Sequence, residues 1–164
     1  MVANIFSNFI FHFFNPVPTF DYILKQLPYR KPFLFVDELR GVNENGSEGT
    51  YTFPENSYFY EGHFAGNPVT PGVILTEVMA QIGVVCLGIF LLGDGRADDL
   101  EIAMTSTQID FYQPVFPGET VTARSTKEYF RFHKLKCKVE LLNQRGELVC
   151  RGSISGMMKL KSHA

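Results

Sequence analysis

Apolar and polar residues alternate along the C-terminal half of the chain with the period of a β-strand. In the clearest run, the apolar positions are Leu135, Cys137, Val139 and Leu141, and the polar positions between them are Lys136, Lys138 and Glu140. This pattern predicts a strand with one buried face and one wet face. A turn at Gln144-Arg145-Gly146 leads to a partner strand over 147–158, and earlier strands are predicted over 102–111 and 120–130. We therefore expect an antiparallel meander, in which a bend at 114–118 joins the strand over 102–111 to the strand over 120–130.

A different pattern fills residues 71–92, which are apolar on every side. Pro71 suits the first position of a helix, and Thr70 is the predicted N-cap. A helix that is hydrophobic all round is either buried centrally or spans a membrane. Glu77 and Gln81 lie inside the run, and a carboxylate at a bilayer centre costs about 3 kcal/mol. We therefore predict a buried helix and no membrane span.

The N-terminal half contains shorter elements. We predict a helix over 20–26, a strand over 33–42, a turn at Asn45-Gly46 and a returning strand over 50–53. Strands, one buried helix and then more strands predict an α+β fold, with a curved sheet around the helix. Residues 20–164 are predicted to form one domain. Residues 1–19 are rich in phenylalanine and are predicted to form an aromatic packing arm, with a membrane-touching segment as the open alternative.

Composition narrows the class of protein. The 164 residues are 45% apolar and 20% charged, which fits one globular domain, and the net charge of −2 gives no reason to expect nucleic-acid binding. The three cysteines form no C-x-x-C pair, so neither a disulfide framework nor a zinc site is predicted. Reduced thiols and the lack of a positively charged leader favour a cytoplasmic location.

Candidate chemistry lies where the loop over 58–70 enters the long helix. His63 is in this loop, and Glu77 follows fourteen residues later on an apolar stripe of the helix. Poor solvation raises the pKa of a carboxyl group, so Glu77 can hold a proton to donate, while an imidazole can accept one. Gly72, at the helix N-terminus, offers a backbone N–H to a substrate oxygen. Each residue also has a purely structural interpretation, and the pattern alone predicts only an acid–base site in an apolar pocket.

The motifs resemble a known family. The resemblance begins at Leu27-Pro28-Tyr29-Arg30-Lys31-Pro32-Phe33-Leu34-Phe35-Val36-Asp37, is densest from Gly62-His63-Phe64 through Pro71-Gly72-Val73 to Glu77-Val78-Met79-Ala80-Gln81, and resumes at Pro114-Val115-Phe116-Pro117-Gly118. Over roughly residues 27–158, the chain resembles the 3-hydroxyacyl-acyl-carrier-protein dehydratases of fatty acid and polyketide synthesis. It resembles the type with a catalytic glutamate.

This resemblance implies a hot-dog fold, a dimer that can assemble further into a hexamer, and an acyl carrier protein as partner. It implies that His63 of one subunit faces Glu77 of the partner subunit in a shared tunnel, where they dehydrate a (3R)-3-hydroxyacyl thioester to a trans-2-enoyl thioester. Gly72 would hold the thioester oxygen, and Phe64, Val73 and Gln81 would line the tunnel. No metal or other cofactor is implied, because the substrate arrives on the carrier's phosphopantetheine.

Three positions depart from the family pattern. Tyr29 replaces a histidine, Ala65 a proline, and Asn67 a position that is commonly basic. These departures favour a specialised pathway, such as polyketide or aryl polyene synthesis. Two alternatives stay open: a hot-dog acyl thioesterase, and a non-catalytic subunit that pairs with a second dehydratase in a heterodimer.

Overall fold

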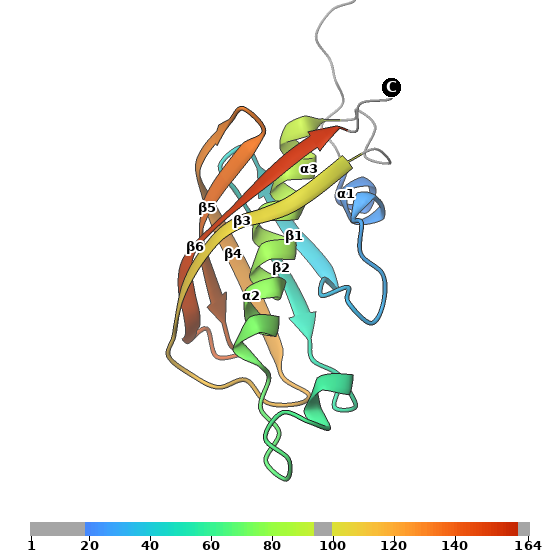
Figure 1. The fold of residues 1–164 in the computed structure, drawn as a ribbon, viewed down its shortest axis with the longest axis vertical. Coiled ribbons are helices and arrows are strands. Elements are labelled where there is room, and N and C mark those ends of the chain that lie inside the picture. Colours follow the sequence, from blue (N-terminus) through green and yellow to red (C-terminus); the bar gives the residue numbers. More distant parts are fainter. Residues whose placement is uncertain (1–18, 94–99, 161–164) are drawn as a thin grey trace, which may run out of the picture.

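In the computed structural model, which describes residues 19–93 and 100–160, an antiparallel sheet wraps around one long helix (Figure 1). The elements in chain order are α1 (Phe20–Gln26), β1 (Glu38–Asn43), β2 (Gly46–Thr52), a 3-10 turn (Tyr58–Tyr60), α2 (Gly72–Ala80), a π-helical segment (Gln81–Cys86), α3 (Leu87–Leu92), β3 (Leu100–Phe111), β4 (Thr120–Arg131), β5 (Lys134–Leu142) and β6 (Leu148–Leu160). The predicted α+β fold is confirmed.

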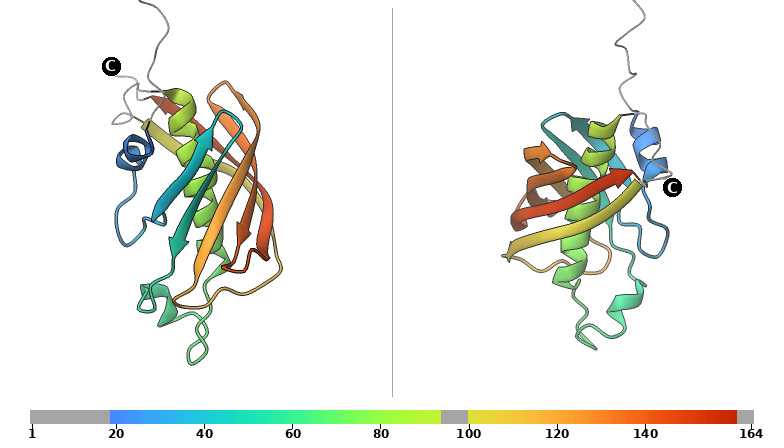
Figure 2. Two further views of the ribbon diagram at one scale, coloured as in Figure 1. Left: turned by 180° about the vertical axis from the view of Figure 1, so that it is seen from behind. Right: turned by 45° about the horizontal axis from the view of Figure 1, so that its top comes forward.

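The sheet has six strands in the order β1-β2-β4-β5-β6-β3, and all neighbours are antiparallel (Figure 2). The predicted meander is correct for β4, β5 and β6 but wrong for β3, which pairs with β6 and not with β4. The reason lies in the connection after β3. Tyr112 and Gln113 both donate their N–H groups to the Val149 carbonyl, which keeps the chain beside β6 before it crosses to β4.

The central helix has the predicted extent but is not α-helical throughout. Residues 81–86 form a π-helical turn between α2 and α3, and the helix ends at Gly93 with a φ of 74°. Val78, Met79 and Ile82 are completely buried, and 83% of the apolar window is buried inside the protein. The helix is long and apolar enough to cross a bilayer, but here it is the core helix.

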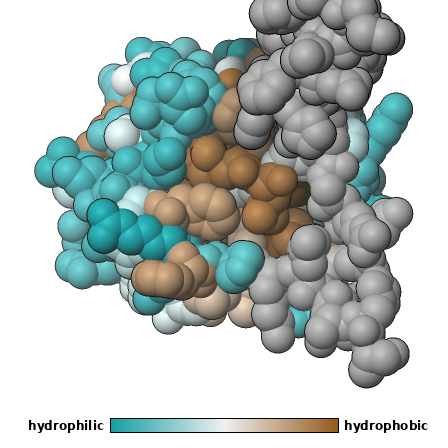
Figure 3. Space-filling model, turned by 90° about the horizontal axis from the view of Figure 1, so that it is seen from above, coloured by the Kyte–Doolittle hydropathy of each residue, from teal (hydrophilic) through white to brown (hydrophobic). Residues whose placement is uncertain are grey.

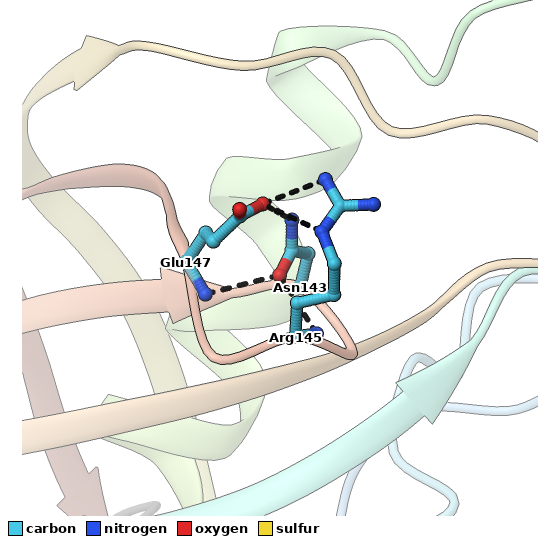
Figure 4. Close-up of polar contacts among 3 residues, drawn as sticks. All are labelled: Asn143, Arg145 and Glu147. Carbon is cyan, nitrogen blue, oxygen red and sulfur yellow. Dashed lines mark hydrogen bonds and ion pairs between the residues drawn. The ribbon is translucent and has the colours of Figure 1, made fainter.

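The β5 prediction is confirmed. Its four apolar residues are at most 1% exposed and face the helix, whereas the side chains between them are more open to solvent. Each such buried side chain contributes about 1.5–3 kcal/mol relative to an exposed one. The turn from β5 to β6 forms where predicted. Figure 4 shows that Asn143 Oδ1 accepts N–H bonds from Arg145 and Glu147, and the Glu147 carboxylate accepts bonds from both other side chains.

The segment that precedes β1 differs from its prediction. The helix over 20–26 is confirmed, with Thr19 Oγ1 accepting a bond from Tyr22 N at its start. The strand predicted over 33–42 begins only at Glu38, because residues 33–35 bind the Gln81 side chain instead of a neighbouring strand. The predicted aromatic arm, apart from Thr19, lies outside the described residues. Seen from the end of the molecule where α3 stops, apolar side chains gather on the surface (Figure 3), and the half-buried Leu91 and Leu92 belong to this end.

Candidate active site

The loop that carries His63 is closed at its base by a buried hydrogen bond. The Tyr60 hydroxyl and Thr70 Oγ1 lie 2.6 Å apart, and both residues are at most 8% exposed. Thr70 N also donates to the Val115 carbonyl at 2.8 Å. Thr70 is therefore not the helix N-cap as predicted, because its side chain binds Tyr60; Pro71 occupies the cap position. Within this loop, His63 N donates to the Phe59 carbonyl at 3.0 Å, which holds the backbone of His63 close to the Tyr60 end.

The orientation of the His63 ring follows from one contact. Its Nδ1 lies 2.7 Å from the Val69 carbonyl oxygen, which can only accept a hydrogen bond. Nδ1 therefore carries the proton and donates it, and Nε2 is left as the acceptor nitrogen. The ring also packs against Phe64, with 4.3 Å between the ring centroids. The contact with Val69 thus leaves Nε2 as the ring nitrogen that can take up a proton from a substrate.

Glu77 is held on α2 by Gln81, one helical turn further along. Gln81 Nε2 donates to Glu77 Oε1 at 2.9 Å and to the Phe33 carbonyl at 2.9 Å, while Gln81 Oε1 accepts from Phe35 N at 2.8 Å. Gln81 is completely buried. Burial raises the pKa of Glu77 above its ordinary value, and the Gln81 hydrogen bond lowers it by a smaller amount. Glu77 therefore keeps its proton to higher pH than an exposed glutamate.

Gly72 begins α2, and its N–H has no intrahelical partner. Within the described part of the chain, this N–H donates no hydrogen bond. A Cβ atom at Gly72 would lie 3.2 Å from Cε1 and Cζ of Phe111. Only glycine fits here without moving the Phe111 ring, and its N–H is available to an incoming acceptor.

The structure does not bring His63 and Glu77 into one cavity of the single chain. His63, Phe64 and Gly72 line an open cavity of about 400 Å³ near the start of α2. Glu77 lines a second cavity of about 250 Å³ between the helix and strands β3 and β6, and the two cavities share no lining residue. His63 is also not among the groups that shift the pKa of Glu77.

The remaining predicted tunnel residues are placed differently from one another. Phe64 is 63% exposed beside His63, and Val73 is 76% exposed on the first turn of α2. Gln81 faces neither cavity and acts through its hydrogen bonds to Glu77 and the backbone. Sequence reasoning missed Tyr60, whose pairing with Thr70 only the folded loop reveals, and it gave no site role to Tyr29, which lines the Glu77 cavity.

Strand β3 leaves one edge of the sheet open. Within residues 19–93 and 100–160 it pairs only with β6, and most of its twelve residues are exposed. Large exposed apolar side chains lie on β3, in the loop that follows it, in the His63 loop and on the first turn of α2, namely Phe64, Val73, Met104, Phe111, Tyr112 and Phe116. We call these six residues the apolar face. Within the same described ranges, no cluster of three or more His, Cys, Asp or Glu side chains is placed to bind a metal ion.

Four matches relate this chain to known proteins. Residues 27–153 match the FabA-like domain. The chain is 34% identical over 146 residues to the 3-hydroxyacyl-acyl-carrier-protein dehydratase FabZ of Rhizobium johnstonii, covering 87% of this chain and 90% of that protein. Among solved structures, the fold is similar to a dehydratase heterocomplex, ApeI:P, from Xenorhabdus doucetiae, with a TM-score of 0.69, 12% identity, and coverage of 85% and 91% of the two chains. It is also similar to a hypothetical thioesterase with coenzyme A from Streptococcus pneumoniae, with a TM-score of 0.56, 15% identity, and coverage of 77% and 88%.

Proposed function

The chain belongs to the FabA-like dehydratase family, and we propose that it removes water from 3-hydroxyacyl thioesters carried on acyl carrier protein, with His63 as base and Glu77 as acid. The products are a trans-2-enoyl thioester and water, and the reaction belongs to fatty acid biosynthesis. The observation that supports the residue assignment is the hydrogen bonding of the two groups. The Val69 carbonyl binds His63 Nδ1 and leaves Nε2 to accept a proton, while burial favours the protonated form of Glu77.

Each residue then has one task. His63 Nε2 takes a proton from the α-carbon, whose electrons form the new double bond as the bond from the β-carbon to its hydroxyl breaks. Glu77 gives its proton to the departing hydroxyl, which leaves as water. The Gly72 N–H donates to the thioester oxygen and stabilises the negative charge that develops on it. Neither proton transfer requires a metal or a redox cofactor, and the thioester is presented by the carrier's phosphopantetheine.

The active site is completed by a second copy of the chain. His63 and Glu77 line separate cavities within one chain, and β3 has an open edge beside the apolar face. Pairing of β3 with β3 of a partner would extend the sheet and cover these apolar side chains. His63 would then face Glu77 of the partner subunit. Sedimentation at micromolar concentration should give at least twice the 18.6 kDa chain mass, and an active monomer would contradict the shared site.

We also propose that the dimer is homomeric and can assemble as a trimer of dimers, with a heterodimer as the alternative. The enzyme is cytoplasmic. The departures at Tyr29, Ala65 and Asn67 support the further proposal that this family member serves a specialised pathway, such as polyketide or aryl polyene synthesis.

The test is the ultraviolet absorbance of the conjugated enoyl thioester, formed from a 3-hydroxyacyl carrier protein. Wild type should form it, and His63→Ala and Glu77→Gln should each lose at least about 100-fold in turnover, the usual size of an acid–base contribution. Release of free thiol without enoyl formation would show a thioesterase instead. A wild-type chain that is inactive alone but active with a second dehydratase would show the non-catalytic partner.

A further inference from the structure

The cavity beside Glu77 has an unusual polar feature. Its walls come from the central helix, from β3 and β6, and from Tyr29, and the side chains that line it are Tyr29, Glu77, Ala80, Val84, Val85, Ile102, Met104, Ile154 and Ser155, with Gly156. Along β6, Ile154 and Met158 are buried against the helix, and Gly156 lies near the Val84 side chain. Three polar side chains are among the lining residues, namely Tyr29, Glu77 and Ser155, and Tyr29 has the larger of the two hydroxyl-bearing side chains.

Tyr29 is fixed in position but its hydroxyl is unused. The Arg30 guanidinium donates to the Tyr29 carbonyl at 2.7 Å and to the Leu27 carbonyl at 3.1 Å, which holds the backbone at this point. Within the described ranges, the Tyr29 hydroxyl makes no hydrogen bond. Burial, with smaller contributions from Glu77 and Cys86 on the helix, raises the pKa of Tyr29, so the phenol stays protonated and can donate a hydrogen bond in the cavity that Tyr29 lines.

The size of the cavity limits what lies beyond the reacting carbons. The cavity volume of about 250 Å³ lies just below the roughly 300–1,000 Å³ of ordinary ligand pockets, so it suits a short chain. A purely hydrocarbon chain of that size would displace water from the Tyr29 hydroxyl and provide no partner for it. A chain with a hydrogen-bonding group near its far end would fill the same space and restore the bond.

We propose that the Tyr29 hydroxyl recognises a hydrogen-bonding group at the far end of the acyl chain, so that the preferred substrate is a 3-hydroxyacyl thioester with a polar terminus. This inference rests on the proposed function, because it places the acyl chain in the cavity beside Glu77. Tyr29 is a specificity residue here and takes no part in the proton transfers. A site that hydrogen-bonds part of its substrate discriminates strongly against the analogue that lacks that group.

The experiment compares two 3-hydroxyacyl thioesters that match in their number of non-hydrogen atoms, one ending in a methyl group and the other in a hydroxyl. Enoyl formation is measured for wild type, for Tyr29→Phe, which removes only the hydroxyl, and for Tyr129→Phe as control. Tyr129 lies on β4, outside this cavity. Wild type and the control should favour the hydroxyl-ended substrate by about tenfold in kcat/KM, and in Tyr29→Phe the ratio should fall to about one.

Other outcomes separate the two claims. If wild type turns over both substrates without preference, or favours the methyl-ended one, the proposal about Tyr29 is wrong and the dehydratase function stands. An unchanged ratio in Tyr29→Phe would also overturn it, because another group must then recognise the terminus. If wild type turns over neither substrate at any chain length, the proposed function itself fails. Should Tyr29→Phe not fold, the wild-type ratio alone still decides whether a polar terminus is preferred.

Discussion

Removal of the Tyr60 hydroxyl tests whether the base of the His63 loop is held as the structure shows. Tyr60→Phe breaks the 2.6 Å bond to Thr70 Oγ1 and leaves that hydroxyl unpaired in a site where Thr70 is 3% exposed. A buried polar group left without its partner costs about 1–3 kcal/mol. Taking about 2 kcal/mol for a chain of this length, the melting temperature should fall by about 4–8 °C.

A double-mutant cycle isolates the pair. Thr70→Val removes the other hydroxyl at nearly constant volume, and it leaves the Tyr60 hydroxyl unpaired in turn. Because Tyr60→Phe/Thr70→Val removes both polar groups, its destabilisation should be less than the sum of the single changes, with a coupling of about 1 kcal/mol. The assay is urea unfolding at one fixed protein concentration, because dimerisation makes stability depend on concentration.

The same cycle has a catalytic readout. Thr70 follows Val69, whose carbonyl orients His63. A loosened loop should lower kcat, since misplacement of a catalytic group by about 1 Å can cost about 100-fold in rate. Thr70→Ser retains the hydroxyl and should keep both stability and kcat closer to wild type than Thr70→Val does. Additive stabilities within about 0.4 kcal/mol, or a full kcat in Tyr60→Phe, would refute this account of the loop.

Three further predictions follow from Glu77, Gly72 and the carrier. The pKa of Glu77 is raised in the folded state, so folding favours its protonated form. Relative to Glu77→Gln, the free energy of unfolding of wild type should therefore fall as pH rises from the ordinary glutamate pKa of about 4.3 through the raised pKa. Urea titrations at several pH values that show no such fall would contradict the burial of this carboxyl. Gly72→Ala should lower kcat/KM by about tenfold or more because its Cβ meets the Phe111 ring, and Phe111→Ala added to it should recover part of the loss in the enoyl assay. If basic residues such as Arg30 and Lys31 steer the acidic carrier, kcat/KM should fall with salt for the carrier-bound substrate but not for a free pantetheine thioester; equal salt dependence for both would exclude steering.

Much of the fold could be predicted from the sequence because buried and exposed residues follow the regular period of a strand or helix. The alternation along β5 and the short helix after Thr19 depend on local contacts, and both appear at the expected residues. The partner of β3 could not be predicted, because strand pairing depends on a connection that passes around the end of the sheet. The late start of β1 could not be predicted either. It is caused by hydrogen bonds to the Gln81 side chain, which is 46 residues from Phe35 in the sequence.

For the candidate site, the residue types in the sequence indicated the chemistry but not the assembly. A histidine before a helix and a glutamate within it predict an acid and a base, and the structure supplies their hydrogen bonds to Val69 and Gln81. Thr70 was predicted as the helix N-cap because threonine is common at that position. The prediction is wrong because the Thr70 hydroxyl is hydrogen-bonded to the Tyr60 hydroxyl instead. The open edge of β3 is a tertiary feature that no local pattern encodes.

The most direct test of the shared acid–base site is to mix two inactive variants. His63→Ala and Glu77→Gln each disable both sites of their own dimer. In a mixed dimer, His63 of the Glu77→Gln chain can face Glu77 of the His63→Ala chain, which leaves one of the two sites intact. With random exchange of equal amounts, about half of the dimers are mixed, so dehydratase activity should return to about a quarter of wild type. If each variant is folded and the subunits exchange, yet no activity returns at any ratio, His63 and Glu77 do not act together across a dimer and the proposed mechanism is wrong.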